Sequence, residues 1–173
     1  MDRIVSDRDF DLIRKSYFEA GPDHIPLFQA VLSAAEKKGL DSALMYLEEC
    51  VTEKRLSWLE KNLPHLERTG DPLGDGFRIF YESYLGASLS EEGEVVEMTA
   101  ARLCSRWRNR CPTLEACIAL GLDTREICRK VYHRPVQAFL SKVDPRLRFD
   151  RNYEAIRPYA PYCEESISLQ EIG

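Results

Sequence analysis

The sequence predicts an α+β fold, with N-terminal helices followed by an antiparallel sheet of three or more strands that carries a helical insertion after its first strand. Residues 1–87 place apolar side chains at helical spacing between capping residues, glycines and prolines. Residues 88–173 are richer in β-branched and aromatic residues with loose alternation, and they hold the cysteine cluster. At 173 residues the two regions together fit one compact domain.

Four helices are expected in the first region. Ser6 or Asp7 caps the first helix, and Pro26 suits the first turn of the second. Asp41 caps the third helix, which Pro64 stops. The expected spans are 6–21, 26–39, 41–62 and about 75–86. The third helix carries one apolar stripe: Leu44, Leu47, Val51, Leu56 and Leu59.

The second region is expected to begin with one strand from about Glu94 to Arg108. Pro112 suits the first turn of the next helix, and Asp123 or Thr124 caps the one after it. The expected helices span residues 111–122, 125–133 and 135–143, the last begun by Pro135, and the final strands span 146–156 and 162–170. The proline-rich stretch 157–161 connects these two strands.

Strand alternation sorts the side chains of the predicted sheet onto two faces. One face of the first strand carries Arg102, Cys104 and Arg106, and the other carries Leu103, Ser105 and Trp107. Glu164 and Glu165 are adjacent on the last strand and therefore face opposite ways. One of them is a candidate general base, and a solvated pair is the alternative.

Composition and charge limit the classes of function. The net charge of −5 argues against a nucleic-acid partner, since such proteins usually present a basic face. No stretch reaches the roughly 18 to 20 apolar residues of a membrane span, and the charged start lacks the apolar core of a signal peptide. The sequence therefore predicts a cytoplasmic protein without a membrane partner, in which cysteines are reduced thiols.

Cys111 is the cysteine in the most suggestive position, directly before Pro112 at the expected N-cap of a helix. The N–H groups and partial positive charge of a helix N-terminus lower the pKa of a nearby thiol. Arg106, Arg108 and Arg110 add positive charge close by. These features predict a nucleophile beside an anion-binding group, and the alternative is a small apolar residue at a strand-to-helix corner.

The other cysteines are less specific. Cys163 begins the last strand and is expected to approach Cys111, whereas Cys50 and Cys117 fit plain core packing. No CxxC pair is present, so the spacing of a zinc finger is absent. A zinc or iron ion assembled from scattered elements remains open, with the ligand set Cys104, Cys111, Cys128 and Cys163.

The second region resembles a known family. The segments "RCPTLEACIALGL", "IC", "DPRLRFDRNYEAIRP" and "YCEESISL" follow the order seen in the L-2-amino-thiazoline-4-carboxylic acid hydrolase-like family. The resemblance covers about residues 94–170 and marks Cys111, Pro112, Cys128 and Cys163. It implies hydrolysis of a cyclic amidine that carries a carboxylate, by opening of a C–N or C–S bond of a five-membered ring.

Three hypotheses follow from these patterns. In the first, the protein is a hydrolase in which the Cys111 thiolate, or a metal-activated water, attacks the amidine carbon of a small molecule that carries a carboxylate; Cys128 and Cys163 are further catalytic candidates. The carboxylate of this molecule docks on arginines, since guanidinium forks suit planar carboxylates; the candidates are Arg102, Arg106, Arg110 and Arg157. In the second, the protein is a non-catalytic domain that binds a small ligand or a metal. In the third, it is a structural protein, with the cysteines as packing. Each is compatible with a homo-oligomer.

Overall fold

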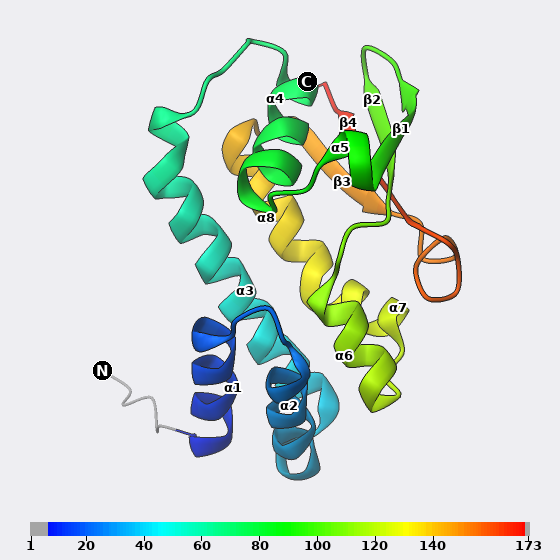
Figure 1. Cartoon of the computed structure of the whole chain (residues 1–173). Helices are drawn as coiled ribbons and strands as arrows, with labels where there is room; N and C mark the ends of the chain where they lie inside the picture. Colours follow the sequence, from blue (N-terminus) through cyan, green and yellow to red (C-terminus); the bar gives the residue numbers. More distant parts are fainter. Residues whose placement is uncertain (1–6, 172–173) are drawn as a thin grey trace.

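Helices fill the first half of the chain and the sheet follows them, in a computed structural model that describes residues 7–171 (Figure 1). The first region forms α1 (Arg8–Glu19), α2 (Ile25–Lys38), α3 (Leu40–Asn62), η1 (Leu63–His65), α4 (Pro72–Phe77), η2 (Arg78–Tyr84) and α5 (Leu89–Glu92). The second forms β1 (Gly93–Met98), β2 (Arg102–Trp107), α6 (Pro112–Leu120), α7 (Thr124–Ile127), η3 (Cys128–Tyr132), α8 (His133–Val143), β3 (Leu147–Arg151) and β4 (Cys163–Leu169). The predicted α+β class is confirmed.

The helix caps agree with the sequence in part. Asp7 caps α1 by accepting a hydrogen bond from the backbone N–H of Asp9, and Asp123 caps α7; Ser6 lies outside the described residues. Asp41 is not a cap, because α3 begins one residue earlier, at Leu40. Gly39, with a φ of 85°, is the one residue between α2 and α3, so it is both the C-cap of α2 and the N-cap of α3.

The sheet has four antiparallel strands in the order β1-β2-β4-β3. The prediction of a single strand from Glu94 to Arg108 is wrong, since this segment folds back on itself as the hairpin β1–β2. Its turn is held by Thr99, whose N–H donates to the Arg102 carbonyl at 2.8 Å and whose hydroxyl accepts from the Arg102 N–H at 3.0 Å. No glycine or proline marks this turn, so the sequence carried none of the usual hairpin signals.

The helical insertion lies between β2 and β3, which is after the second strand and not the first, because the predicted first strand is a hairpin. The insertion also contains one long helical run in place of two of the predicted helices. Pro135 does not begin a helix, because α7, η3 and α8 are continuous from Thr124 to Val143. The run widens into a π-helical turn in η3, just before the proline. A second π-helical segment, η2, continues α4 directly, and this helix starts at Pro72 with Asp71 as its cap, earlier than expected.

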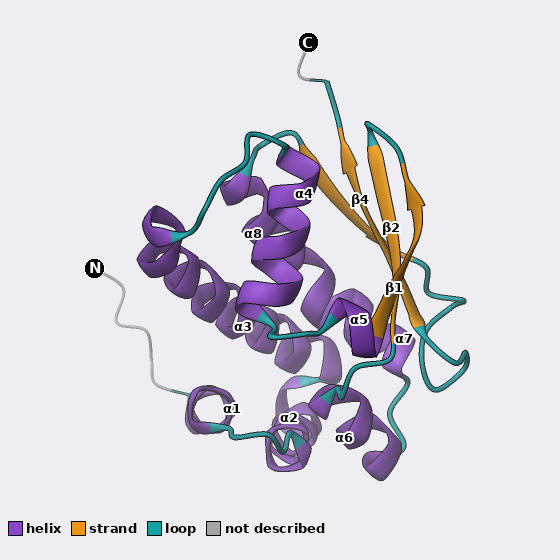
Figure 2. Cartoon of the chain, turned by 45° about the horizontal axis from the view of Figure 1, so that its top comes forward, coloured by secondary structure: helices purple, strands orange, loops and turns teal. Residues whose placement is uncertain are grey.

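Helices cover one face of the sheet, and the other face is open (Figure 2). Alternate residues of β2, Leu103 and Trp107, pack with Phe77 and Phe139 from the covering helices. Arg102, Cys104 and Arg106 lie on the opposite face, so the predicted alternation of β2 is confirmed. The register pairs Glu165 with Ser105 and Glu164 with Arg106, which places the two carboxylates on opposite faces, also as predicted.

A second group of buried side chains lies among α1, α2 and α3, and it includes Ala116, Cys117, Ile127 and Val131 from the helical insertion. Helix α3 contributes to both groups, since its Leu59 packs with the sheet-facing cluster. The regions 1–87 and 88–173 therefore share both cores and fold against each other.

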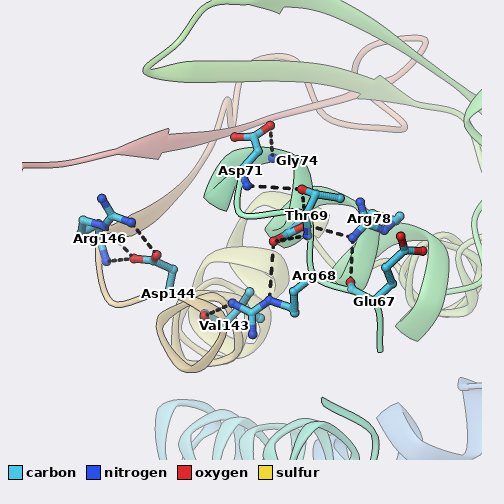
Figure 3. Close-up of polar contacts among 10 residues, drawn as sticks. Glu67, Arg68, Thr69, Asp71, Gly74, Arg78, Val143, Asp144 and Arg146 are labelled. Carbon is cyan, nitrogen blue, oxygen red and sulfur yellow. Dashed lines mark hydrogen bonds and ion pairs between the residues drawn. The ribbon is translucent and has the colours of Figure 1, made fainter. Parts of the chain in front are cut away.

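Asp75 anchors the loop that leads into α4 and η2, and its partners Thr69 and Arg78 are labelled in Figure 3. Its carboxylate is buried and accepts hydrogen bonds from the backbone N–H of Thr69 at 3.0 Å, the Thr69 hydroxyl at 2.8 Å and Arg78 at 2.9 Å. Burial by itself raises the pKa of Asp75, but the hydrogen bonds from Thr69 and Arg78 outweigh it and lower the pKa to about 2. This network fixes the turn from which η2 starts.

Asp75 should make the free energy of unfolding depend on pH in the acidic range. Its pKa is below the ordinary value of 3.8, so its contribution is present above about pH 4 and is lost as the pH falls towards 2. The shift corresponds to roughly 2 kcal/mol. Urea unfolding from pH 5 to pH 2 should show a shallower loss of stability for Asp75→Asn than for the original protein. Asp41→Asn, at an exposed ion pair, should lose stability with falling pH as steeply as the original protein does. The same pH dependence in all three proteins would contradict the role given to Asp75.

Candidate functional site

A cavity of about 260 Å³ opens where the start of β4 meets the helical insertion. Its lining comes from α3, η2, the ends of β2 and β3, the loop before α6, and η3. The side chains that line it include His24, Arg55, Tyr81, Trp107, Arg110, Cys111, Thr113, Cys128, Tyr132, Arg151, Arg157, Cys163 and Glu165. The volume is below the roughly 300–1,000 Å³ of pockets for drug-sized ligands, so it suits a small metabolite.

Three of the cysteines singled out from the sequence line this cavity: Cys111, Cys128 and Cys163. They come from the cap of α6, the first residue of η3 and the first residue of β4. Cys111 occupies the predicted N-cap position, and its sulfur accepts a hydrogen bond from the Leu114 N–H at 3.4 Å. The fold thus gathers thiols that are up to 52 residues apart in the chain, counted from Cys111 to Cys163.

The protonation of two of these thiols differs from the expectation. Burial raises the pKa of the Cys111 thiol, and it outweighs the lowering effects of the Leu114 N–H and of Arg157. Burial also raises the pKa of Cys128 to about 12. The predicted lowering of the Cys111 pKa at the helix N-terminus is therefore wrong in direction, because removal of the sulfur from water has the larger effect.

Cys163 differs from the other two in its contact with a cation. Its sulfur accepts hydrogen bonds from the Arg157 side-chain Nε at 3.3 Å and from the Arg157 backbone N–H at 3.5 Å. The same guanidinium is held by the carbonyl of Asn109, to which its Nη1 donates at 2.7 Å. Arg157 therefore lies fixed against the sulfur of Cys163 inside the cavity.

The four predicted substrate arginines are only partly gathered. Arg157 and Arg110 line the cavity, and Arg110 is paired with Glu115 at 2.8 Å. Arg106 pairs with Glu164 at 2.8 Å on the open face of the sheet, and Arg102 pairs with Glu97. Because the strand ends at Trp107, the alternation expected to unite these arginines does not extend beyond it.

The remaining cysteines lie elsewhere. Cys50 and Cys117 are buried in the core around α3, as the sequence suggested. Cys104 is on the open face of the sheet, so the four-cysteine ligand set is not assembled. Within residues 7–171, no group of three or more His, Cys, Asp or Glu side chains is arranged to hold a metal ion. The described side chains therefore do not fit the zinc or iron alternative.

A buried ion pair supports one wall of the cavity. Arg151 donates to one oxygen of Glu165 at 3.0 Å, and the two side chains are 8% and 11% exposed. The Tyr81 hydroxyl donates to the other oxygen of Glu165. Burial, followed by the charge of Glu165, raises the pKa of Tyr81 well above its ordinary value, so this tyrosine stays a donor. Sequence reasoning placed Glu165 correctly but did not identify its partners.

Arg55 is a lining residue that the sequence analysis did not single out. It is 8% exposed, and its Nε and Nη1 have no hydrogen-bond partner among the described residues. Its position on α3 carries a signal, because Val51, Arg55 and Leu59 are spaced by four and all three are buried. The predicted apolar stripe includes Leu56, but this residue is only half-buried, and the inward position is taken by the charged Arg55.

A short polar chain forms another part of the wall. Nδ1 of His24 lies 3.2 Å from the Thr113 hydroxyl, which in turn lies 2.8 Å from the Tyr132 hydroxyl. Burial lowers the pKa of His24, so its imidazole is neutral near pH 7. His24 reaches the cavity from the segment before α2, a placement that its local sequence does not indicate.

Comparisons with protein-family models, curated proteins and solved structures found no match. No helix within residues 7–171 combines the length and the apolar character needed to cross a membrane.

Proposed function

We propose that this cavity binds a small cyclic amidine bearing a carboxylate and that Cys163 opens its ring by hydrolysis. The observation that carries the proposal is the contact between the Cys163 sulfur and the fixed guanidinium of Arg157 inside a small, cation-rich cavity. A nearby cation is one of the features that activate a cysteine nucleophile. The resemblance to the thiazoline-carboxylate hydrolase-like family points to the same class of substrate.

The reaction balances with water as the only co-reactant. The Cys163 sulfur bonds to the amidine carbon, and the thiol proton passes to the amidine nitrogen. The ring C–N bond then breaks, and its nitrogen leaves as an amine. Water attacks the carbon that is still attached to sulfur, breaks the C–S bond to the protein and returns the thiol. One water is consumed in each turnover, and no redox step is needed.

The charges in the cavity support a carboxylate on the substrate. Four arginines line it, Arg55, Arg110, Arg151 and Arg157, against a single carboxylate, Glu165. Arg151 is neutralised by Glu165, and Arg110 by Glu115 outside the lining. The remaining charge is positive and favours an anionic ligand, because a low-dielectric cavity strengthens its attraction.

Ligand binding without turnover is the second candidate. Burial raises the pKa of both Cys111 and Cys128, so these two thiols are protonated and weakly nucleophilic at neutral pH. In this reading the sulfurs form a polarizable wall for a bound carboxylate, and Cys163 contributes shape alone.

Replacing Cys163 distinguishes the two candidates. With 2-amino-thiazoline-4-carboxylate as the probe, mass spectrometry should detect a product heavier by one water. Cys163→Ala should lose this activity by at least 100-fold, a typical effect of removing a reacting group. The matched control is Cys104→Ala, which removes a thiol from the open face of the sheet and should keep the original rate. Undiminished turnover by Cys163→Ala would exclude the nucleophile, and binding without turnover by the original protein would favour the second candidate.

A further inference from the structure

Arg55 presents a buried positive charge that the described residues leave uncompensated. The residue is 8% exposed, two of its guanidinium nitrogens lack hydrogen-bond partners, and no ion pair within residues 7–171 includes it. A buried charge without a partner is strongly unfavourable, and unsatisfied buried polar groups are rare in native proteins. Since Arg55 also lines the cavity, an anion bound there supplies the missing partner.

The surroundings of Arg55 hold its guanidinium in place without using its hydrogen-bonding capacity. The rings of Phe80, Tyr84 and Tyr132 lie with their centroids 5.5, 5.7 and 5.6 Å from the guanidinium carbon. Cation–π contacts of this kind attract the charge but accept no conventional N–H hydrogen bond. The aromatic side chains thus fix the position of Arg55 and leave its donors free for a ligand.

The other arginines of the cavity are already engaged. Arg110 donates to Glu115 and to the Pro22 carbonyl, Arg151 donates to Glu165, and Arg157 donates to Cys163 and Asn109. These guanidinium groups have partners that hold them in their present orientation. Arg55 is therefore the guanidinium in the described lining with donors to spare, which suits a ligand with one anionic group.

We infer that Arg55 is the carboxylate-recognition residue of the cavity and that its ligand is a small, flat ring bearing one carboxylate. A guanidinium fork matches a carboxylate in geometry and binds it through two parallel hydrogen bonds. The cavity lining also includes Tyr81, Trp107 and Tyr132, so part of its wall is aromatic and suits an apolar ring. This inference deepens the proposed function, because it assigns the recognition of the carboxylate to a residue other than the arginines of the sheet and the insertion.

Binding of thiazole-4-carboxylate and of its uncharged amide tests the inference, with calorimetry as the readout. The carboxylate should bind the original protein at least tenfold more tightly than the amide. Arg55→Met should abolish this preference by weakening the carboxylate at least tenfold, while affinity for the amide stays the same. Arg55→Lys should restore part of the preference, since it keeps the charge but not the fork. Arg106→Met, at a paired arginine outside the cavity, should keep the preference.

A stability measurement separates recognition from a structural role. Without ligand, thermal unfolding of Arg55→Met should occur at or above the original temperature, because the substitution removes an uncompensated buried charge. The inference would be overturned if Arg55→Met bound the carboxylate as tightly as the original protein does. It would also be overturned if the original protein bound the carboxylate and the amide with equal affinity, or bound neither probe. Arg55-dependent binding in a protein without turnover would retain the inference and reject the proposed hydrolysis. Turnover that needs Cys163 but not Arg55 would do the reverse.

Discussion

Replacing Arg151 with methionine should destabilise the fold by about 3–5 kcal/mol, the usual result of removing one partner from a buried ion pair. Arg151 and Glu165 are both nearly buried, and the guanidinium donates to the carboxylate through Nε at 3.1 Å and Nη2 at 3.0 Å. Without Arg151, the Tyr81 hydroxyl is the one donor that the described residues leave to this carboxylate, which is 11% exposed. Urea unfolding at pH 7 measures the loss, and the amide Glu165→Gln combined with Arg151→Met should recover part of it.

The chain contains a matched control for this effect. Arg106 and Glu164 form a similar cross-strand ion pair, between β2 and β4. This pair lies on the open face of the sheet, where its side chains are 34% and 21% exposed. Arg106→Met should cost only about 0–1 kcal/mol, as exposed ion pairs do. Similar losses for Arg151→Met and Arg106→Met would mean that burial does not set the strength of the inner pair.

Replacing Trp107 with alanine should cost about 3–5 kcal/mol, the range for deleting a large buried aromatic side chain. Its ring stacks on Tyr81 with centroids 4.6 Å apart and on Phe77 at 5.9 Å, and its Nε1 donates to the Ser105 hydroxyl at 2.9 Å. The fit on its other side is close, since a Cβ added to Gly93 would come within 2.7 Å of the ring. The cavity left by alanine therefore has little freedom to collapse.

Urea unfolding of Trp107→Ala checks this prediction, and the hairpin supplies its control. Met98 is 70% exposed at the end of β1, so Met98→Ala should change the free energy of unfolding by less than about 0.5 kcal/mol. Trp107→Phe, which keeps most of the apolar contact but loses the N–H donor, should give an intermediate loss. A cost below about 1 kcal/mol for Trp107→Ala would show that the stacked rings contribute little to the fold.

Local patterns in the sequence predicted most of the architecture because they reflect local physics. The alternation of β2 and the opposite faces of Glu164 and Glu165 follow from the two-residue period of a strand, which holds wherever the strand is placed. The hairpin was missed because Thr99 makes its turn through side-chain and backbone hydrogen bonds that ordinary turn statistics do not emphasise. The continuity of α7, η3 and α8 was missed because a proline usually marks a helix start.

The site was less accessible to sequence reasoning, because its properties depend on burial. The cap position of Cys111 was visible, but the direction of its pKa shift was not, since desolvation depends on how many distant segments close around the sulfur. Arg55 was missed because its role requires two facts that only a fold provides: that its helix face points inward, and that aromatic rings from η2 and η3 surround it. The grouping of Cys111, Cys128 and Cys163 was anticipated, but Cys104, which was placed in the candidate ligand set, does not line the cavity.

Because of the two π-helical segments, the lining of the cavity depends on how many residues each helical turn contains as well as on which residues they are. Phe80 and Tyr81 lie in η2, and Cys128 and Tyr132 lie in η3, so each wide turn delivers side chains to the same hollow. A π-helical turn contains one residue more than a regular turn. Deleting that residue would restore ordinary helical winding and change which side chains of the widened turn face the cavity. Deletion of a single residue there would thus change which side chains line the cavity, while the composition of the chain stays almost the same.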